Sequence, residues 1–274
     1  MPQSSAMSIA SVNGRRVAYE DTGGDGPAVI FSHGLLMDRE MFAPQVEALR
    51  GGFRCIAWDA RGHGESDEAT EPFTYWDSAD DMLALAAHLG VERAFLVGMS
   101  QGGFLSLRAA LRRPDFVLGL ALLDTQAGVE DPDLVPNNEA MAHIWKTHGL
   151  NDDLAQLVAA MIMSPGYAGN DHWIAKWKQR PTEHVDMPLT ALHGREDLHD
   201  RLGEITAPAI VIHGSVDAAI PVELAQRLAD GLPNCERLVL VEGGGHAANL
   251  SHPEPVNAAL GDFLRRHSAS GAPS

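Results

Sequence analysis

Short apolar runs rich in β-branched residues alternate along the chain with longer segments in which apolar residues recur at helical spacing. This alternation is typical of a mostly parallel sheet covered by helices on both faces. Eight runs predict strands, over residues 7–12, 16–21, 28–32, 53–58, 94–98, 117–123, 209–213 and 236–241. Helices are predicted near residues 76–89, 101–112, 222–230 and 255–266.

The direction of the strands follows from what connects them. Asn13 and Gly14 separate the first two predicted strands, and both tolerate the positive φ of a tight hairpin turn, so the sheet should begin with an antiparallel pair. The later strands are separated by helical segments, and connections of that length join parallel neighbours. We therefore predict an α/β fold with an eight-stranded, mostly parallel sheet flanked by helices.

Residues 126–205 interrupt the alternation, because no convincing strand lies between them. We expect a helical insertion there, a cap, after the sixth strand. Residues 1–125 and 206–268 would then form the core of the fold. Residues 269–274 contain few side chains that build a core, so we expect a disordered tail there.

Composition and charge indicate a folded, soluble protein. The chain has 274 residues, of which 45% are apolar and 21% charged. Its net charge of −17 repels phosphate backbones and anionic lipid surfaces, which disfavours nucleic-acid and membrane binding. The longest glycine-free apolar run, residues 157–163, is too short to cross a bilayer.

A cytoplasmic location is also predicted. Residues 1–7 have neither the basic flank nor the apolar stretch of a secretory signal. Cys55 and Cys235 show no metal-ligand spacing and no disulfide framework, which fits a reducing compartment.

The motif that points most clearly to chemistry is G-x-S-x-G, formed by Gly98, Ser100 and Gly102 between a predicted strand and a predicted helix. A serine on such a sharp turn is held in a strained conformation that exposes its hydroxyl, and the glycines avoid collisions with nearby backbone. The simpler alternative is a glycine-rich turn whose serine only caps the helix.

A serine hydroxyl needs a base and an anionic partner for that base before it can act as a nucleophile. Asp217 follows the seventh predicted strand, and His246 follows the eighth after three glycines. Alone, each would be an ordinary turn or loop residue. Together, beyond the carboxyl ends of successive strands and in the order Ser, Asp, His, they predict a catalytic triad.

At these residues the chain resembles the α/β-hydrolase fold superfamily over nearly its whole length. The segment 31–35 resembles the H-G-x oxyanion segment, residues 59–66 resemble the D-x-R-G-x-G-x-S turn, and residues 214–221 resemble the acid loop. Asp124, after the sixth strand, is where some relatives place the acid, so it remains an alternative to Asp217.

The resemblance implies a role for each matching residue. Ser100 would be the nucleophile, His246 the general base and then acid, and Asp217 the orienting carboxylate. Backbone N–H groups of Leu35 and Gln101 would form the oxyanion hole.

Within the superfamily, residues 191–214 resemble 3-oxoadipate enol-lactonases and similar small-capped carboxylesterases. Cofactor-free haloperoxidase and perhydrolase relatives commonly have an aromatic residue where this chain has Leu35, which weakens the peracid-forming interpretation. Dehalogenase and soluble epoxide-hydrolase relatives have an aspartate where this chain has Ser100, so those reactions are disfavoured.

Three tryptophans of the cap, Trp145, Trp173 and Trp177, are candidates for the substrate pocket, with ordinary helix packing as the alternative. Trp173 and Trp177 share one face if residues 171–179 are helical. The cap histidines have no zinc-binding spacing, so no metal is predicted.

The resulting prediction is a serine esterase or lactonase that needs no cofactor and acts on a small-molecule substrate. The first alternative is hydrolysis of a carbon–carbon bond in a vinylogous diketone by the same triad. A perhydrolase or haloperoxidase-like enzyme and a triad-retaining ligand receptor also remain open, and the protein could form a homo-oligomer.

Overall fold

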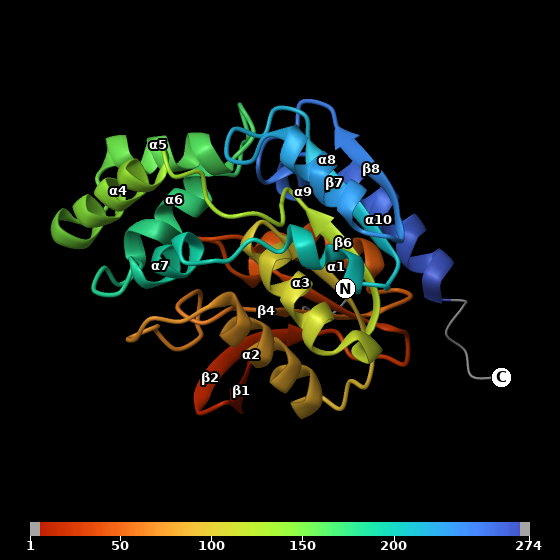
Figure 1. Ribbon diagram of the computed structural model, residues 1–274. Helices are drawn as coiled ribbons and strands as arrows, with labels where there is room; N and C mark the ends of the chain where they lie inside the picture. The colour runs from red at the N-terminus through yellow and green to blue at the C-terminus, as the bar shows by residue number, and fades with distance from the viewer. Residues whose placement is uncertain (1–5, 269–274) are drawn as a thin grey trace.

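Eight strands form one continuous sheet through the computed structural model, which describes residues 6–268 (Figure 1). Residues 1–5 and the predicted tail, residues 269–274, lie outside the described chain. The strands are β1 Ser8–Val12, β2 Arg15–Asp21, β3 Ala28–Ser32, β4 Arg54–Trp58, β5 Ala94–Met99, β6 Val117–Leu123, β7 Ala209–Gly214 and β8 Cys235–Val241.

The order of strands across the sheet is β1-β2-β4-β3-β5-β6-β7-β8. β1 pairs antiparallel with β2, and β2 pairs antiparallel with β4, whereas the other pairs are parallel. Asn13 and Gly14 have φ of 50° and 74°, as the hairpin turn requires. The predicted α/β fold with a mostly parallel, eight-stranded sheet is confirmed.

Helices cover both faces of the sheet. The helices of the core are α1 Ala43–Leu49, α2 Tyr75–His88, α3 Gln101–Arg112, α8 Val222–Gly231, α9 Ala248–Ser251 and α10 Pro253–Ser268. Side chains of β5 alternate between two buried clusters. Leu96 packs in the cluster that contains α2, α3 and α8, while Val97 packs in the cluster that contains α1 and α10.

Between β6 and β7 the chain forms four α-helices, α4 Val135–His148, α5 Asp152–Ile162, α6 Asn170–Gln179 and α7 Met187–His193, followed by the short 3₁₀ helix His199–Glu204. They gather at one side of the core, coloured green to teal in Figure 1. We call residues 126–205 the cap segment. No helix within residues 6–268 is both long and apolar enough to cross a membrane.

Candidate active site

Ser100 lies on the sharp turn between β5 and α3. Its φ of 51° and ψ of −115° are a strained conformation for a residue with a side chain, and 6% of the residue is exposed. Two glycines allow the turn: a Cβ on Gly98 would lie 2.2 Å from the Gly102 carbonyl oxygen, and one on Gly102 would lie 1.9 Å from the Ser32 carbonyl oxygen. The local sequence therefore folds as a sharp strand-to-helix turn, which we call the elbow.

Replacing Gly102 with alanine should destabilise the fold by about 3 kcal/mol or more, because the new methyl group would collide with backbone that cannot move aside. Gly51→Ala is the matched control, since nothing lies within 4 Å of a Cβ at that position. Chemical denaturation of both variants measures the difference. Equal stability of the two variants would contradict the close packing of the elbow.

The carboxyl ends of three neighbouring strands are aligned around Ser100. The Ser100 backbone N–H donates to the Leu123 carbonyl at 2.9 Å, and the Asp124 N–H donates to the Ile212 carbonyl at 2.9 Å. The loops after β7 and β8 then bring Asp217 and His246 to this same edge of the sheet.

Asp217 and His246 form a hydrogen-bonded pair. His246 Nδ1 lies 2.8 Å from Asp217 Oδ2, and the backbone N–H groups of Ala219 and Ile220 donate to the other carboxylate oxygen at 2.8 and 2.9 Å. Burial raises the pKa of Asp217, but the His246 imidazole and these donors outweigh burial and keep its pKa below the ordinary value. Because Asp217 is then an anionic acceptor, the proton of neutral His246 resides on Nδ1 and leaves Nε2 as the basic atom.

The Ser100 hydroxyl makes no hydrogen bond to His246 or to any other described residue. The structure thus brings together Asp217 and His246, and places Ser100 at the same sheet edge without joining it to them. Catalytic contacts of this kind commonly tighten only when substrate binds.

Asp124 is close to the pair but makes no hydrogen bond to His246 within the described chain. It is 1% exposed, and its Oδ1 accepts the Gly214 N–H at 2.8 Å. Burial, followed by the charge of neighbouring Asp217, raises the pKa of Asp124 well above its ordinary value. Because Asp217 is hydrogen-bonded to His246 and Asp124 is not, and because burial disfavours the charged form of Asp124, the arrangement favours Asp217 as the acid.

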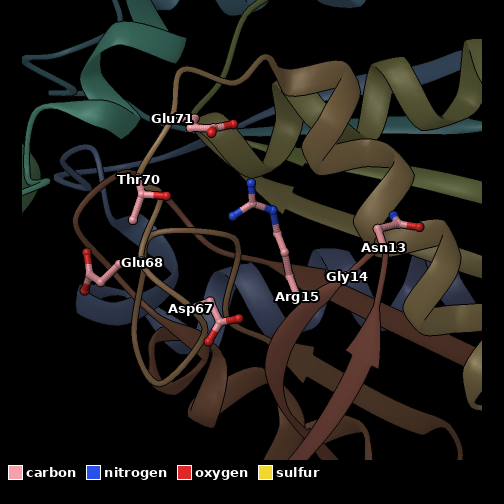
Figure 2. Close-up of a pocket in the computed structure, with 7 residues that line it drawn as sticks. All are labelled: Asn13, Gly14, Arg15, Asp67, Glu68, Thr70 and Glu71. Carbon is pink, nitrogen blue, oxygen red and sulfur yellow. The ribbon is translucent and has the colours of Figure 1, made fainter.

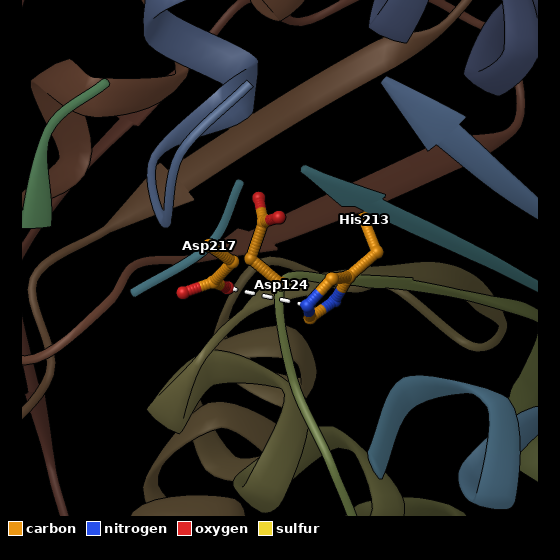
Figure 3. A group of neighbouring side chains, drawn as sticks. All are labelled: Asp124, His213 and Asp217. Carbon is orange, nitrogen blue, oxygen red and sulfur yellow. Dashed lines mark ion pairs between the residues drawn. The ribbon is translucent and has the colours of Figure 1, made fainter. Parts of the chain in front are cut away.

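His213 completes the buried group around Asp217 (Figure 3). Its Nε2 lies 2.9 Å from the Ile220 carbonyl oxygen and 3.3 Å from Asp217 Oδ2. Because that nitrogen faces a carbonyl, it carries a proton and cannot ligate a metal. Although ligand atoms of Asp124, His213 and Asp217 lie within 4.8 Å of one another, this donor set does not suit a cation.

The segment after β3, residues 33–38, contains the predicted oxyanion donor Leu35, and we call it the oxyanion loop. The Gly34 carbonyl accepts the Met37 N–H at 3.1 Å and lies 2.8 Å from His33 Nδ1. His33 Nε2 accepts the Ala60 N–H at 3.0 Å, so Nδ1 carries the proton and donates to Gly34.

The hydrogen bonds to the Gly34 carbonyl also set the direction of the Leu35 N–H group. A peptide group is planar and trans, so fixing the Gly34 carbonyl fixes the Leu35 N–H in the opposite direction. Burial lowers the pKa of His33, which keeps its imidazole neutral and in the required tautomer. Gln101, the second predicted donor, is the first residue of α3, where helical N–H groups have no partner in the helix. The role of His33 was not predicted from the sequence, although it is the histidine of the H-G-x segment.

The three cap tryptophans are buried: Trp145, Trp173 and Trp177 all pack in the cluster that contains α1 and α10. They differ in their indole N–H groups. That of Trp177 donates to the Leu36 carbonyl at 2.9 Å, whereas that of Trp145 has no partner among residues 6–268. Their predicted contact with substrate stays a prediction.

A hollow of about 500 Å³ lies at the turn between β1 and β2, and another of about 510 Å³ lies between α4 and α7. Figure 2 shows Arg15 rising from the first hollow among the acidic side chains of Asp67, Glu68 and Glu71. Neither hollow is lined by a predicted site residue.

Comparison with known proteins gives the same family from sequence and from structure. Residues 27–253 match the family model described as the alpha/beta hydrolase fold. A protein of Variovorax paradoxus, named as a candidate carbamate hydrolase, RutD, is 32% identical over 91% of this chain and 96% of its own.

Two solved structures are similar over their full lengths. The enol-lactonase of Burkholderia xenovorans has a TM-score of 0.87 and 28% identity, covering 94% of this chain and 100% of its own. An esterase of Thermogutta terrifontis has a TM-score of 0.87 and 27% identity, covering 96% and 99%.

Proposed function

Because the chain belongs to the alpha/beta hydrolase fold family, we propose that it is a serine hydrolase that cleaves carboxylic esters or lactones through an acyl-enzyme on Ser100. The observation that carries this proposal is the 2.8 Å hydrogen bond between Asp217 and His246, at the sheet edge where the elbow holds Ser100. An anion that holds a neutral imidazole in one tautomer is what a serine needs to become nucleophilic.

In the first half of the reaction Ser100 Oγ attacks the substrate carbonyl carbon, and His246 Nε2 takes the hydroxyl proton. The carbonyl oxygen becomes an oxyanion that accepts hydrogen bonds from the Leu35 and Gln101 N–H groups. When the carbon–oxygen bond to the alcohol breaks, His246 returns the proton to the leaving oxygen. An ester on Ser100 remains.

In the second half water attacks that ester, and His246 Nε2 takes the water proton. Collapse of the second oxyanion breaks the bond to Ser100 Oγ, which recovers its proton from His246. The products are a carboxylic acid and free enzyme. Asp217 remains an anion throughout and stabilises the imidazolium that forms twice in each cycle.

Carbamates are a second candidate class. The 32% identical relative from V. paradoxus is named for carbamate hydrolysis, and a carbamate carbonyl can be attacked by Ser100 in the same way. The similarity to structures named as an enol-lactonase and an esterase favours lactones and esters for this chain instead. All three classes share a carbonyl carbon that carries a heteroatom leaving group.

A panel of substrates separates these proposals. We expect multiple turnovers of short-chain p-nitrophenyl esters or of a lactone, with aryl carbamates as the second class. Cleavage of a vinylogous diketone with no turnover of esters, lactones or carbamates would replace the proposal by carbon–carbon bond hydrolysis. A single stoichiometric burst without turnover would instead favour a ligand receptor.

A further inference from the structure

One face of α6 lies against the oxyanion loop. Trp177 donates its indole N–H to the Leu36 carbonyl at 2.9 Å. One residue earlier, the Lys176 ammonium lies 2.5 Å from Asp38 Oδ2 and 2.9 Å from Glu40 Oε2. The cap segment therefore contacts the loop at two consecutive residues of one helix.

The loop is strained where Trp177 holds it. Leu36 has a φ of 65°, in the left-handed region that a branched side chain rarely adopts. A residue keeps such a conformation only when its surroundings hold it there. The neighbouring Leu35 carries the proposed oxyanion donor, so the strain lies one residue from that donor.

Trp177 is well suited to hold the loop. Only 2% of the residue is exposed, so its hydrogen bond to Leu36 is protected from competing water. Without the Trp177 indole N–H, the Leu36 carbonyl would lose its partner from the cap segment. The left-handed conformation of Leu36 would then be less stable.

Lys176 holds the last residue of the oxyanion loop, Asp38. Asp38 is buried and its carboxylate accepts the Glu40 N–H at 3.0 Å, which caps the short 3₁₀ helix Arg39–Phe42. The Lys176 ammonium neutralises that buried carboxylate. The segment that carries Leu35 is thus held at Leu36 by Trp177 and at its last residue, Asp38, by Lys176.

We propose that Trp177 is a positioning residue for the oxyanion hole: its indole N–H fixes the Leu36 carbonyl and, through it, the direction of the Leu35 N–H. This inference rests on the proposed function of Ser100 and Leu35. It gives the cap segment a part in stabilising the transition state, in addition to any part in forming a pocket.

Substituting a residue of a pocket wall and substituting a positioning residue change different kinetic constants. A wall acts on substrate binding, so changing it alters KM and the preference among acyl chain lengths. A positioning residue for the oxyanion hole acts in the transition state, so changing it lowers kcat by a similar factor for every acyl chain.

The test uses Trp177→Phe, which keeps an aromatic ring and removes the N–H. We expect kcat to fall about tenfold for p-nitrophenyl acetate, butyrate and hexanoate alike, with KM changed by less than about twofold. Affinity for an alkyl trifluoromethyl ketone, which forms an oxyanion adduct with the serine, should fall by the same factor. Affinity for the carboxylic acid product should not change.

The matched control is Trp76→Phe, because Trp76 lies on α2, outside the oxyanion loop, and the change removes its indole hydrogen bond to Glu196. It should keep the kcat of the unmodified enzyme. Lys176→Gln removes the contact with Asp38 and should also lower both kcat and affinity for the ketone. This variant keeps the test available if Trp177→Phe does not fold.

The outcomes separate this inference from the proposed function. If the unmodified enzyme neither turns over esters nor binds the ketone, the proposed function fails. If the unmodified enzyme does both, and folded Trp177→Phe or, failing that, Lys176→Gln shows unchanged ketone affinity, the positioning role is wrong. A shift in acyl-chain preference with unchanged kcat on the best substrate would assign Trp177 to the pocket wall instead.

Discussion

Ser100→Ala is expected to lower kcat for ester hydrolysis by about 10⁶-fold, because the proposed acyl-enzyme forms on the Ser100 hydroxyl. The fold should be unaffected, since the hydroxyl makes no hydrogen bond within the described chain and its loss leaves no buried partner unsatisfied. Steady-state rates with a p-nitrophenyl ester measure the effect, and circular dichroism checks the fold.

Ser11→Ala is a suitable control, because Ser11 is exposed on β1, the edge strand farthest from the elbow in strand order. It should keep full activity. If Ser100→Ala retained the activity of this control, Ser100 would not be the nucleophile. The proposed site at the elbow would then be wrong.

The second large effect concerns the acid. Asp217→Asn should lower kcat by about 10⁴-fold, because an amide can present its N–H₂ to His246 Nδ1 and favour the wrong tautomer, and it cannot stabilise the imidazolium. Asp124→Asn should cost less than about tenfold. Burial raises the pKa of Asp124 and disfavours its charged form, and asparagine keeps the oxygen that accepts the Gly214 N–H.

Rates of the two variants on one ester, measured side by side, decide between the acids. The comparison is well matched, because both changes convert a buried carboxyl to an amide of the same size. A larger loss from Asp124→Asn than from Asp217→Asn would move the triad acid to the end of β6.

Strands β3 to β7 could be predicted because they are mainly buried apolar runs with clear boundaries, and β1 and β2 because Asn13 and Gly14 mark the hairpin turn between them. The predicted bounds of β3 and β6 agree with the structure, and the others differ by one residue at one end. Helix α1, Ala43–Leu49, was not predicted, because seven residues are too few to establish a helical period. The start of α2 was predicted one residue late, although Thr74 and Asp77 form a capping box that marks it.

The candidate site residues follow from motifs, but their contacts depend on tertiary packing. The sequence favoured Asp217 as the acid but left Asp124 as an alternative, because both follow strands at the same sheet edge. The hydrogen bond to His246 and the burial of Asp124 favour Asp217. Trp177 and Leu36 are 141 residues apart, so no local pattern could have predicted their hydrogen bond.

Covalent labelling tests most directly whether Asp217 and His246 make Ser100 nucleophilic. The protein is treated with diethyl p-nitrophenyl phosphate, the released p-nitrophenolate is counted per chain, and the modified residue is located by peptide mass spectrometry. We predict stoichiometric release with the diethylphosphoryl group on Ser100, and greatly slowed labelling in Asp217→Asn. Modification of a different residue, or no labelling of folded protein, would contradict the account.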